Sequence, residues 1–262
     1  MIALADPADP RLKTAPGEPL LRAVIQGLAR TVGPGLRREV WLALDDEGRP
    51  AGAVCRTEGG LWATAAEAAA AETAGFLAAL GGLPGTVDGG LSPLLPGLWE
   101  RSSVLEYQGT TPEETPLCIP SAMALADCNA AAGAISPWDR DALYAELHLR
   151  IRRGAAQVVL IPDEAGAPAA GAATLLGEEA GVIGCLACRR EKQGRGYGSA
   201  ALAAAVRCLL ERGKRPLLAC REELLPFYTV RGFVPIGEVW ERKEFSFWHK
   251  SLPLTGGRDP EL

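Results

Sequence analysis

The chain has 262 residues, of which 48% are apolar, and a formal net charge of −5. This length allows one large or two modest domains with a sizeable core. The negative charge argues against a nucleic-acid partner held through phosphate contacts, and it mildly favours a cationic substrate such as an amine. The longest alanine-rich stretch, residues 63–80, carries Glu67 and Glu72, so it is not expected to span a membrane.

The N-terminus and the cysteines predict a cytoplasmic protein. No basic region precedes an apolar one in the first ten residues, so no signal peptide is evident. Seven cysteines, an odd number, then indicate reduced thiols. Cys185 and Cys188 form a Cys-x-x-Cys pattern, but no second Cys or His pair lies near them in the sequence, and on a strand they would point to opposite faces. We expect buried core thiols and no metal site.

The first 109 residues predict strands and one long helix. Residues 40–54 contain an apolar strand, an acidic turn with Gly and Pro, and a second strand of small residues, which is typical of a hairpin. A helix is expected over 65–80, ended by two glycines. The triplet Trp99–Arg101 precedes a segment suited to a strand. Residues 110–120, rich in Pro and Thr, predict a linker.

Residues 121–262 predict a second mixed α/β domain with helices on both faces of its sheet. A capping serine followed by proline, Ser136-Pro137, marks one helix start, and the basic residues before Gly154 suit that helix's negative end. The expected helices cover residues 121–132, 136–153, 199–212 and 226–231, and the expected strands cover 157–161, 169–176, 182–188, 217–220, 234–240 and 244–250.

The two parts of the chain are similar to each other. Residues 40–54 parallel residues 158–172, and Trp99–Arg101 parallels Trp240–Arg242. We interpret the chain as two related halves with an insertion in the second. Two unrelated α/β halves with chance similarity remain the alternative.

The segment Gln193–Gly198, called the glycine loop below, lies between an expected strand and an expected helix. Its glycines allow a tight bend, and the unpaired N–H groups at a helix start favour an anion. It is not a Walker loop, because no Lys-Ser or Lys-Thr follows. It also lacks the order and the following acidic residue of a dinucleotide fingerprint. Alone, the loop is equally compatible with a phosphate site and with a plain turn.

A second motif decides between these readings. Phe227–Phe233, Phe-Tyr-Thr-Val-Arg-Gly-Phe, follows the next expected strand. Together the two motifs resemble the GNAT superfamily of acyl-CoA-dependent N-acyltransferases over roughly residues 119–250. The resemblance implies a GNAT-like α/β fold, with residues 121–262 as the catalytic domain. Residues 1–109 lack both motifs, so we interpret them as a degenerate GNAT-like domain that does not hold acyl-CoA.

The resemblance also implies roles for individual residues. Backbone groups beside the strand that precedes the glycine loop hold the pantetheine, and N–H groups of the loop bind the pyrophosphate. The implied cofactor-binding residues are Leu186, Ala187, Cys188, Gln193, Gly194, Arg195, Gly196, Tyr197, Gly198 and Ser199. Arg195 either neutralises a phosphate or is a solvated loop cation. Tyr228 matches the family's tyrosine acid, with packing of its ring as the alternative.

The general base is where the chain departs from the family pattern. Many relatives carry a glutamate on the strand before the glycine loop, where this chain has Val182. Glu179, with Glu178 in the turn just before, is a weak candidate, and both also suit a solvated turn. Arg221–Glu223 replace the family's frequent asparagine. His148 is expected on the protein surface, on a helix that often borders the acceptor site, and His249 is expected to be structural.

The expected function is transfer of an acetyl group from acetyl-CoA to a primary amine by direct attack. Acetyl-CoA is the co-substrate, no metal is expected, and the partner is a small-molecule or protein amine. Neither nucleic acid nor a membrane is expected as a partner, and a homodimer is compatible with the sequence. The alternative function is a non-catalytic acyl-CoA-binding, regulatory or scaffolding module.

Overall fold

The computed structural model describes residues 1–31, 39–57, 60–81, 85–136 and 139–242. Within them, one mixed eleven-stranded sheet has the order β1-β2-β3-β4-β5-β11-β6-β10-β9-β8-β7. The strands are β1 (Ile2–Ala5), β2 (Glu39–Leu44), β3 (Pro50–Thr57), β4 (Gly60–Ala65), β5 (Thr86–Asp88), β6 (Trp99–Tyr107), β7 (Ala156–Pro162), β8 (Pro168–Leu176), β9 (Ala180–Cys188), β10 (Arg215–Cys220) and β11 (Phe233–Arg242). The helices are α1 (Pro19–Ala29), α2 (Glu67–Ala79), α3 (Ala122–Ala132), α4 (Asp139–Arg152), α5 (Tyr197–Leu210) and α6 (Leu225–Thr229).

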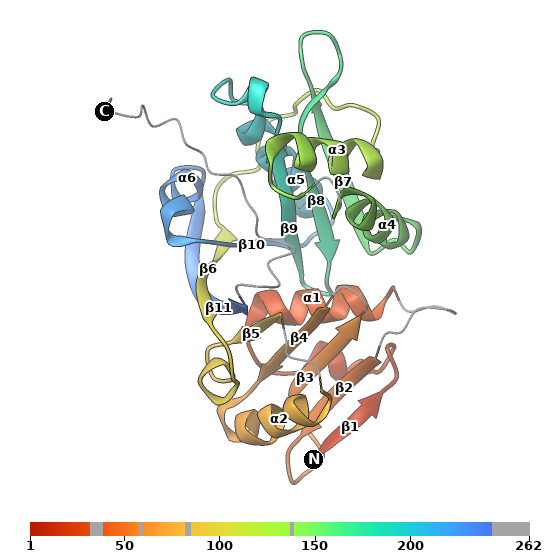
Figure 1. The fold of residues 1–262 in the computed structure, drawn as a ribbon, viewed down its shortest axis with the longest axis vertical. Coiled ribbons are helices and arrows are strands. Elements are labelled where there is room, and N and C mark those ends of the chain that lie inside the picture. Colours follow the sequence, from red (N-terminus) through yellow and green to blue (C-terminus); the bar gives the residue numbers. More distant parts are fainter. Residues whose placement is uncertain (32–38, 58–59, 82–84, 137–138, 243–262) are drawn as a thin grey trace.

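The sheet spans two lobes, one built mainly from each half of the chain (Figure 1). Strands β1 to β5 and helix α2 form the lower lobe in that view, and β7 to β10 with α3, α4 and α5 form the upper one. Helix α1 lies between them. The predicted mixed α/β fold with helices on both faces is confirmed.

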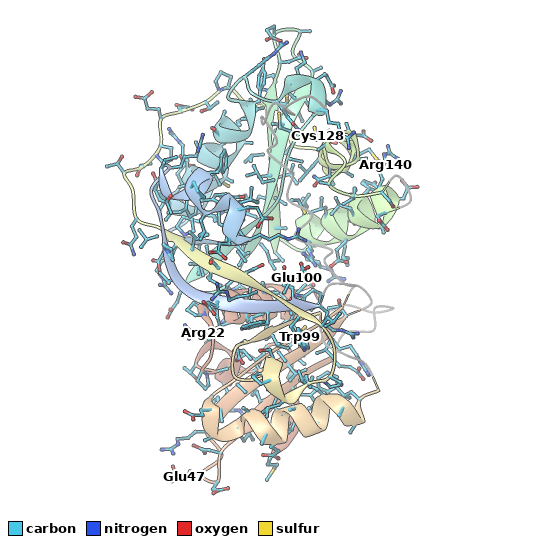
Figure 2. The ribbon with its side chains drawn as sticks, turned by 60° about the vertical axis from the view of Figure 1, so that its left-hand side comes forward. Arg22, Glu47, Trp99, Glu100, Cys128 and Arg140 are labelled. Carbon is cyan, nitrogen blue, oxygen red and sulfur yellow. The ribbon has the colours of Figure 1, made fainter. Side chains whose placement is uncertain are left out.

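The two halves exchange their final strands. Strand β6 ends the first half, yet it pairs with β10 and β11, while β11 ends the second half and pairs with β5. The two Trp-Glu-Arg triplets oppose each other in this exchange: Trp240 faces Arg101, and Glu241 faces Glu100. Figure 2 labels Trp99 and Glu100, which both belong to β6. The boundaries predicted at residues 109 and 120 therefore separate two segments of the sequence, but a single sheet contains strands from both segments.

The predicted hairpins are confirmed, and their two turns contain the same pair of hydrogen bonds from backbone N–H groups to an aspartate side chain. The Asp45 carboxylate accepts from the N–H groups of Glu47 and Arg49, at 3.0 and 2.9 Å. The Asp163 carboxylate accepts from Ala165 and Ala167, at 3.0 and 2.9 Å. Each aspartate folds its own turn through these bonds, as aspartates in turns commonly do. The same local chemistry thus builds β2–β3 and β7–β8.

Most other expected elements are present with shifted ends. Helix α2 begins at Glu67 because Ala65 still belongs to β4, and α3 is capped by the Ser121 side chain. Of the helix expected from Ser136, the structure describes α4 from Asp139 onward. The strand expected over 244–250 and His249 within it lie outside the described residues.

Helix α1 packs on strands of both halves of the chain. Gly27 comes so close to the Leu175 side chain that a Cβ there would clash, and Gly177 lies equally close to Ala23. At its C-terminal end, Gln26 accepts a hydrogen bond from the Glu178 N–H, and Arg30 pairs with the Glu178 carboxylate at 2.5 Å. Helix α1 thus covers the inner part of the face whose outer part is covered by α3 and α4, while α5 covers the opposite face.

Candidate active site

The glycine loop has the backbone that its sequence predicts. Gly194 and Gly196 adopt φ of +75° and +88°, in the left-handed region that favours glycine, and a Cβ on either would point into open space. Gln193 donates from Nε2 to the Cys188 carbonyl at 3.2 Å, which ties the loop to the end of β9. Gly196 is the N-cap of α5 and has no side chain to occupy the first N–H groups. The loop therefore presents helix N–H groups to an open space that suits an anion.

Strand β9 separates from β10 just before the loop. Residues Ala180–Val182 of β9 pair in parallel with Arg215–Leu217 of β10. Beyond Val182, β9 continues to Cys188, and its last residues share a pocket with α6. On its other edge β9 has a bulge at Cys185, whose φ is +51°. Asn129 of α3 donates to the Cys185 carbonyl at 3.2 Å and holds this bulge. A bulge disrupts the ladder and leaves backbone groups of β9 available to a ligand.

A pocket of about 370 Å³ fills the opening between β9, the glycine loop and α6. Its lining residues are Leu186, Ala187, Cys188, Lys192, Gln193, Gly194, Gly196, Tyr197, Gly198, Ser199, Leu224, Phe227, Tyr228 and Arg231. Every expected cofactor-binding residue except Arg195 is among them. The pocket is apolar on the β9 side and glycine-rich at the helix start, which fits a thioester with a phosphate-bearing tail.

Tyr228 lies in the wall of this pocket, with 5% of its surface exposed. Its ring makes edge-on contacts with Phe227 and Phe233, at centroid distances of 5.0 and 5.9 Å. Burial raises the pKa of the Tyr228 phenol, so the group carries its proton at neutral pH. The side chain is therefore both packed and equipped with a proton to donate.

Arg231 is a site residue that the sequence reasoning missed. Its Nε donates to the Ser199 hydroxyl at 3.0 Å, and its guanidinium stacks over the Phe227 ring at 3.9 Å. These contacts fix a cation beside the first turn of α5, where it adds to the positive helix end. The available signal was helical spacing, since Arg231 lies four and three residues after Phe227 and Tyr228, one helical turn on.

Two further cations, Lys192 just before the glycine loop and Arg195 within it, face the β7–β8 turn. Lys192 pairs with Asp163 at 2.8 Å and with Glu164 at 3.2 Å, and Arg195 lies 3.7 Å from Glu164. Hydrogen bonds from its own backbone, from Tyr197 and from Lys192 lower the pKa of Glu164 to about 2. Arg195 is more than half exposed, which fits the solvated loop cation better than a pocket residue.

Two other candidates lie away from the pocket. Glu179 is exposed in the turn before β9, seven residues from the nearest pocket residue of that strand, Leu186. His148 is exposed on α4, with its ring 5.5 Å from that of Tyr144. The structure brings neither side chain to Tyr228.

The Cys-x-x-Cys pair is buried, as expected for core thiols. Cys185 packs with α3 and α4, whereas Cys188 packs in the cluster around α5. Burial raises the pKa of Cys185 to about 12 and also raises that of Cys188. Among the described residues, no group of three or more His, Cys, Asp or Glu side chains is arranged to hold a metal ion. In the same residues, no helix combines the length and the apolarity needed to cross a membrane.

Part of the chain is similar to a known protein family. Residues 125–233 match the acetyltransferase (GNAT) family. Residues 125–233 are therefore similar to a GNAT acetyltransferase domain, and they contain the β9 bulge, the glycine loop and Tyr228. This supports acyl transfer from acyl-CoA in general terms. No curated protein matches the sequence.

Solved structures share the fold over nearly the whole chain. A tandem GNAT protein from the clavulanic acid biosynthesis pathway is 15% identical, with a TM-score of 0.57, covering 92% of this chain and 97% of its own. A GCN5-related N-acetyltransferase from Sphaerobacter thermophilus is 16% identical (TM-score 0.55; 92% and 93% covered). One from Kribbella flavida is 19% identical (TM-score 0.53; 85% and 94% covered). At these identities the similarity establishes the fold and leaves the substrate open.

Proposed function

We propose that the protein transfers an acetyl group from acetyl-CoA to a primary amine by direct attack of the amine on the thioester. The observation that carries this proposal is that the glycine loop, the end of β9 just after its bulge and Tyr228 line one pocket. An anion site, a set of strand backbone groups and a proton donor supply, in turn, a place for the pyrophosphate, polarisation of the carbonyl and protonation of the leaving sulfur. The cysteines without disulfide partners favour a cytoplasmic setting for it.

In this proposal the N–H groups of the glycine loop and the first turn of α5 bind the pyrophosphate, with Arg231 as the fixed cation beside them. Charge-assisted hydrogen bonds of this kind contribute about 1.5–3 kcal/mol each. The apolar stretch Leu186–Cys188 contacts the pantetheine. Backbone groups at the Cys185 bulge polarise the thioester carbonyl.

Tyr228 gives its proton to the sulfur as CoA leaves. A neutral amine nitrogen attacks the carbonyl carbon, the C–S bond breaks, and the thiolate takes the phenolic proton. The proton that the nitrogen loses as the amide forms returns through water to the Tyr228 phenolate. Burial disfavours both anions, phenolate and thiolate, so a pocket that raises the pKa of the phenol also raises that of the departing thiol. We assign no role to Glu179, because it lies in an exposed turn at the far end of β9.

The test is release of thiol from acetyl-CoA across a panel of primary amines. Turnover with at least one amine supports the proposal. Tight acetyl-CoA binding without thiol release for any amine, small or on a peptide, would instead identify a non-catalytic acyl-CoA-binding module.

Replacement of Tyr228 by Phe separates its two candidate roles. The ring and its contacts with Phe227 and Phe233 remain, while the proton is lost. We expect acetyl-CoA affinity to stay nearly unchanged and kcat to fall by about 10²–10⁴, the usual cost of a lost general acid. A Tyr228→Phe enzyme with wild-type turnover, measured where chemistry limits the rate, would leave Tyr228 with a packing role alone.

A further inference from the structure

We propose that Arg231 is a positioning residue for Tyr228, because it joins the end of α6 to the first turn of α5 and thereby fixes the proton donor in the pocket; this inference rests on the function proposed above. Arg231 lies just beyond the C-terminal end of α6 and lines the same pocket as Tyr228. The residue then has two tasks, contact with a phosphate and support of the group that protonates the sulfur.

A continuous chain of side-chain contacts leads from α5 to Tyr228. The Ser199 hydroxyl of α5 accepts a hydrogen bond from Arg231 Nε at 3.0 Å. The Arg231 guanidinium lies 3.9 Å above the centre of the Phe227 ring. The Phe227 ring in turn meets the Tyr228 ring edge-on, at a centroid distance of 5.0 Å. A displacement of Arg231 therefore reaches the Tyr228 ring through one intervening side chain.

Arg231 also closes the C-terminal end of α6. Its Nη1 donates to the Phe227 carbonyl at 2.5 Å, and its backbone N–H donates to the Tyr228 carbonyl at 2.9 Å. The last carbonyl groups of a helix have no partner within it, and a basic side chain at this end stabilises them. Helix α6 has only five residues, far fewer than an isolated helix needs in water. Its order therefore depends on bonds from outside the helix.

The other surface of α6 offers little support. Thr229 and Val230 are exposed, and the Thr229 hydroxyl bonds back to the Pro226 carbonyl within the same helix. Figure 1 shows α6 at the margin of the molecule. In the part of the chain that the structure describes, the bond between Arg231 and Ser199 is the side-chain hydrogen bond that connects α6 and its end to α5. Its loss would leave ring packing to hold Tyr228 in place.

The guanidinium of Arg231 can support α6 and bind a phosphate at the same time. Its bonds to the Ser199 hydroxyl and the Phe227 carbonyl use two of five N–H groups, so three remain for a ligand. Burial lowers the pKa of Arg231, and among the described residues no carboxylate pairs with it. A lysine has one nitrogen and no planar face to stack on Phe227, so it cannot replace both functions.

Arg231→Lys separates support from charge. The variant keeps a cation in the pocket but loses the forked hydrogen bonds and the stacking on Phe227. We expect acetyl-CoA affinity to fall by less than about tenfold and kcat to fall by about 10²-fold, the effect of displacing a reacting group by about 1 Å. Calorimetry and thiol release with an accepted amine measure the two quantities. A residue that only binds phosphate would instead change affinity and leave kcat unaltered.

Ser199→Ala removes the other end of the connection without changing any charge. The Ser199 N–H group remains for the pyrophosphate, so acetyl-CoA affinity should change little, while kcat should fall by about tenfold. Thr229→Ala is the matched control, because it removes a hydroxyl from an exposed position of α6 that does not line the pocket. It should keep wild-type affinity and turnover.

A double-mutant cycle tests whether Arg231 acts through Tyr228. With Tyr228→Phe the proton is already absent, so adding Arg231→Lys should cause no further fall in kcat. Losses that simply multiply in the double variant would show that Arg231 contributes independently of Tyr228, and the positioning role would be wrong.

Hydrogen exchange provides a measurement that does not need turnover. The N–H groups of Val230 and Arg231 bond to carbonyls of α6. Their exchange should be at least about tenfold faster in Arg231→Lys and in Ser199→Ala, and unchanged in Thr229→Ala. Unchanged exchange in the first two variants would overturn the inference and leave the acetyltransferase proposal standing. If wild type releases thiol with no amine, the acetyltransferase proposal fails and with it the role of Tyr228, whereas exchange still decides whether Arg231 holds α6.

Discussion

The ends of β4 and β9 occupy corresponding places in the two halves, but one is closed and the other open. After β4, the Asp88 carboxylate of β5 accepts hydrogen bonds from the Thr64 hydroxyl at 2.8 Å and from the Ala65 N–H at 2.7 Å. These bonds connect the end of β4 to the end of β5. After β9, the neighbouring strand turns away, and a pocket of about 370 Å³ lies in the gap.

The helices that follow these two strands differ in the conformation of their N-cap residues. Helix α2 has Ala66 as its N-cap, in an ordinary extended conformation, whereas α5 has Gly196 in the left-handed region. The order β2-β3-β4-α2-β5-β6 in the first half therefore repeats as β7-β8-β9-α5-β10-β11 in the second, with α6 added, while the proposed ligand site depends on a few residues where strand meets helix. The comparison shows that a fold carries a function only where such residues keep the site open.

The largest effect is expected when the same residue is introduced at both N-caps, because only one of the two substitutions should abolish acetyl-CoA binding. Gly196→Asp adds a side chain and a negative charge where the pyrophosphate is proposed to bind, and we expect acetyl-CoA binding to be lost. Ala66→Asp, the matched control, places the same side chain at the N-cap of α2, where it suits the helix. Calorimetry should find one site per chain in wild type and in Ala66→Asp.

Two sites per chain, or unchanged affinity in a folded Gly196→Asp protein, would contradict the difference between the halves. Gly196→Asn serves as a second control, since it has nearly the same size without the charge and tolerates the left-handed region. It should weaken binding less than the aspartate does.

Removing the Asp88 carboxylate tests what closes the first half. Asp88→Ala leaves the Ala65 and Leu91 N–H groups and the Thr64 hydroxyl without this acceptor. At roughly 1–3 kcal/mol for each of these three groups left unsatisfied, the free energy of unfolding should fall by at least about 3 kcal/mol. Denaturant titration measures this loss. A second acetyl-CoA site in the variant would show that Asp88 alone, and not the missing glycine loop, prevents binding.

The smallest effect is expected at Glu18, beside this closed junction. Burial raises its pKa from the ordinary 4.5 to about 7. The folded state therefore keeps a proton that the unfolded chain releases, and this group lowers stability as pH rises from about 4.5 to about 7. Glu18→Gln still offers an oxygen to the Leu21 N–H.

The variant should be more stable than wild type at pH 8, by about 2 kcal/mol given its partial exposure, and nearly equal at pH 4. Urea unfolding at both pH values measures the difference. A stability gap that does not change with pH would assign the effect to packing rather than to the proton.

The sequence was sufficient to predict the parts whose signals are local. The glycine loop needs left-handed residues at fixed positions, and Gly194 and Gly196 provide them. The hairpin turns follow from Asp45 and Asp163, which bond to residues two and four positions later. Tyr228 was placed through a motif and lies in the pocket wall as expected.

The parts that were not predicted depend on contacts between distant residues. The two Trp-Glu-Arg triplets indicated equivalent strands, but nothing in either triplet shows that the strands change places. Packing of α1 on β8 and β9 relies on Gly27 and Gly177, which are 150 positions apart. Glu241 is buried where β11 pairs with both β5 and β6, so its burial has no local signature.

The exchange of β6 and β11 has a consequence for how the chain folds during synthesis. A ribosome makes β6 about 125 residues before β11 begins, and β11 is the strand that pairs between β5 and β6. Until then β5 and β6 each lack a neighbour, and unpaired edges of this kind invite aggregation. The first half therefore cannot finish folding ahead of the second. We expect both halves to complete folding in one late, cooperative step, once β11 leaves the exit tunnel and pairs with β5 and β6.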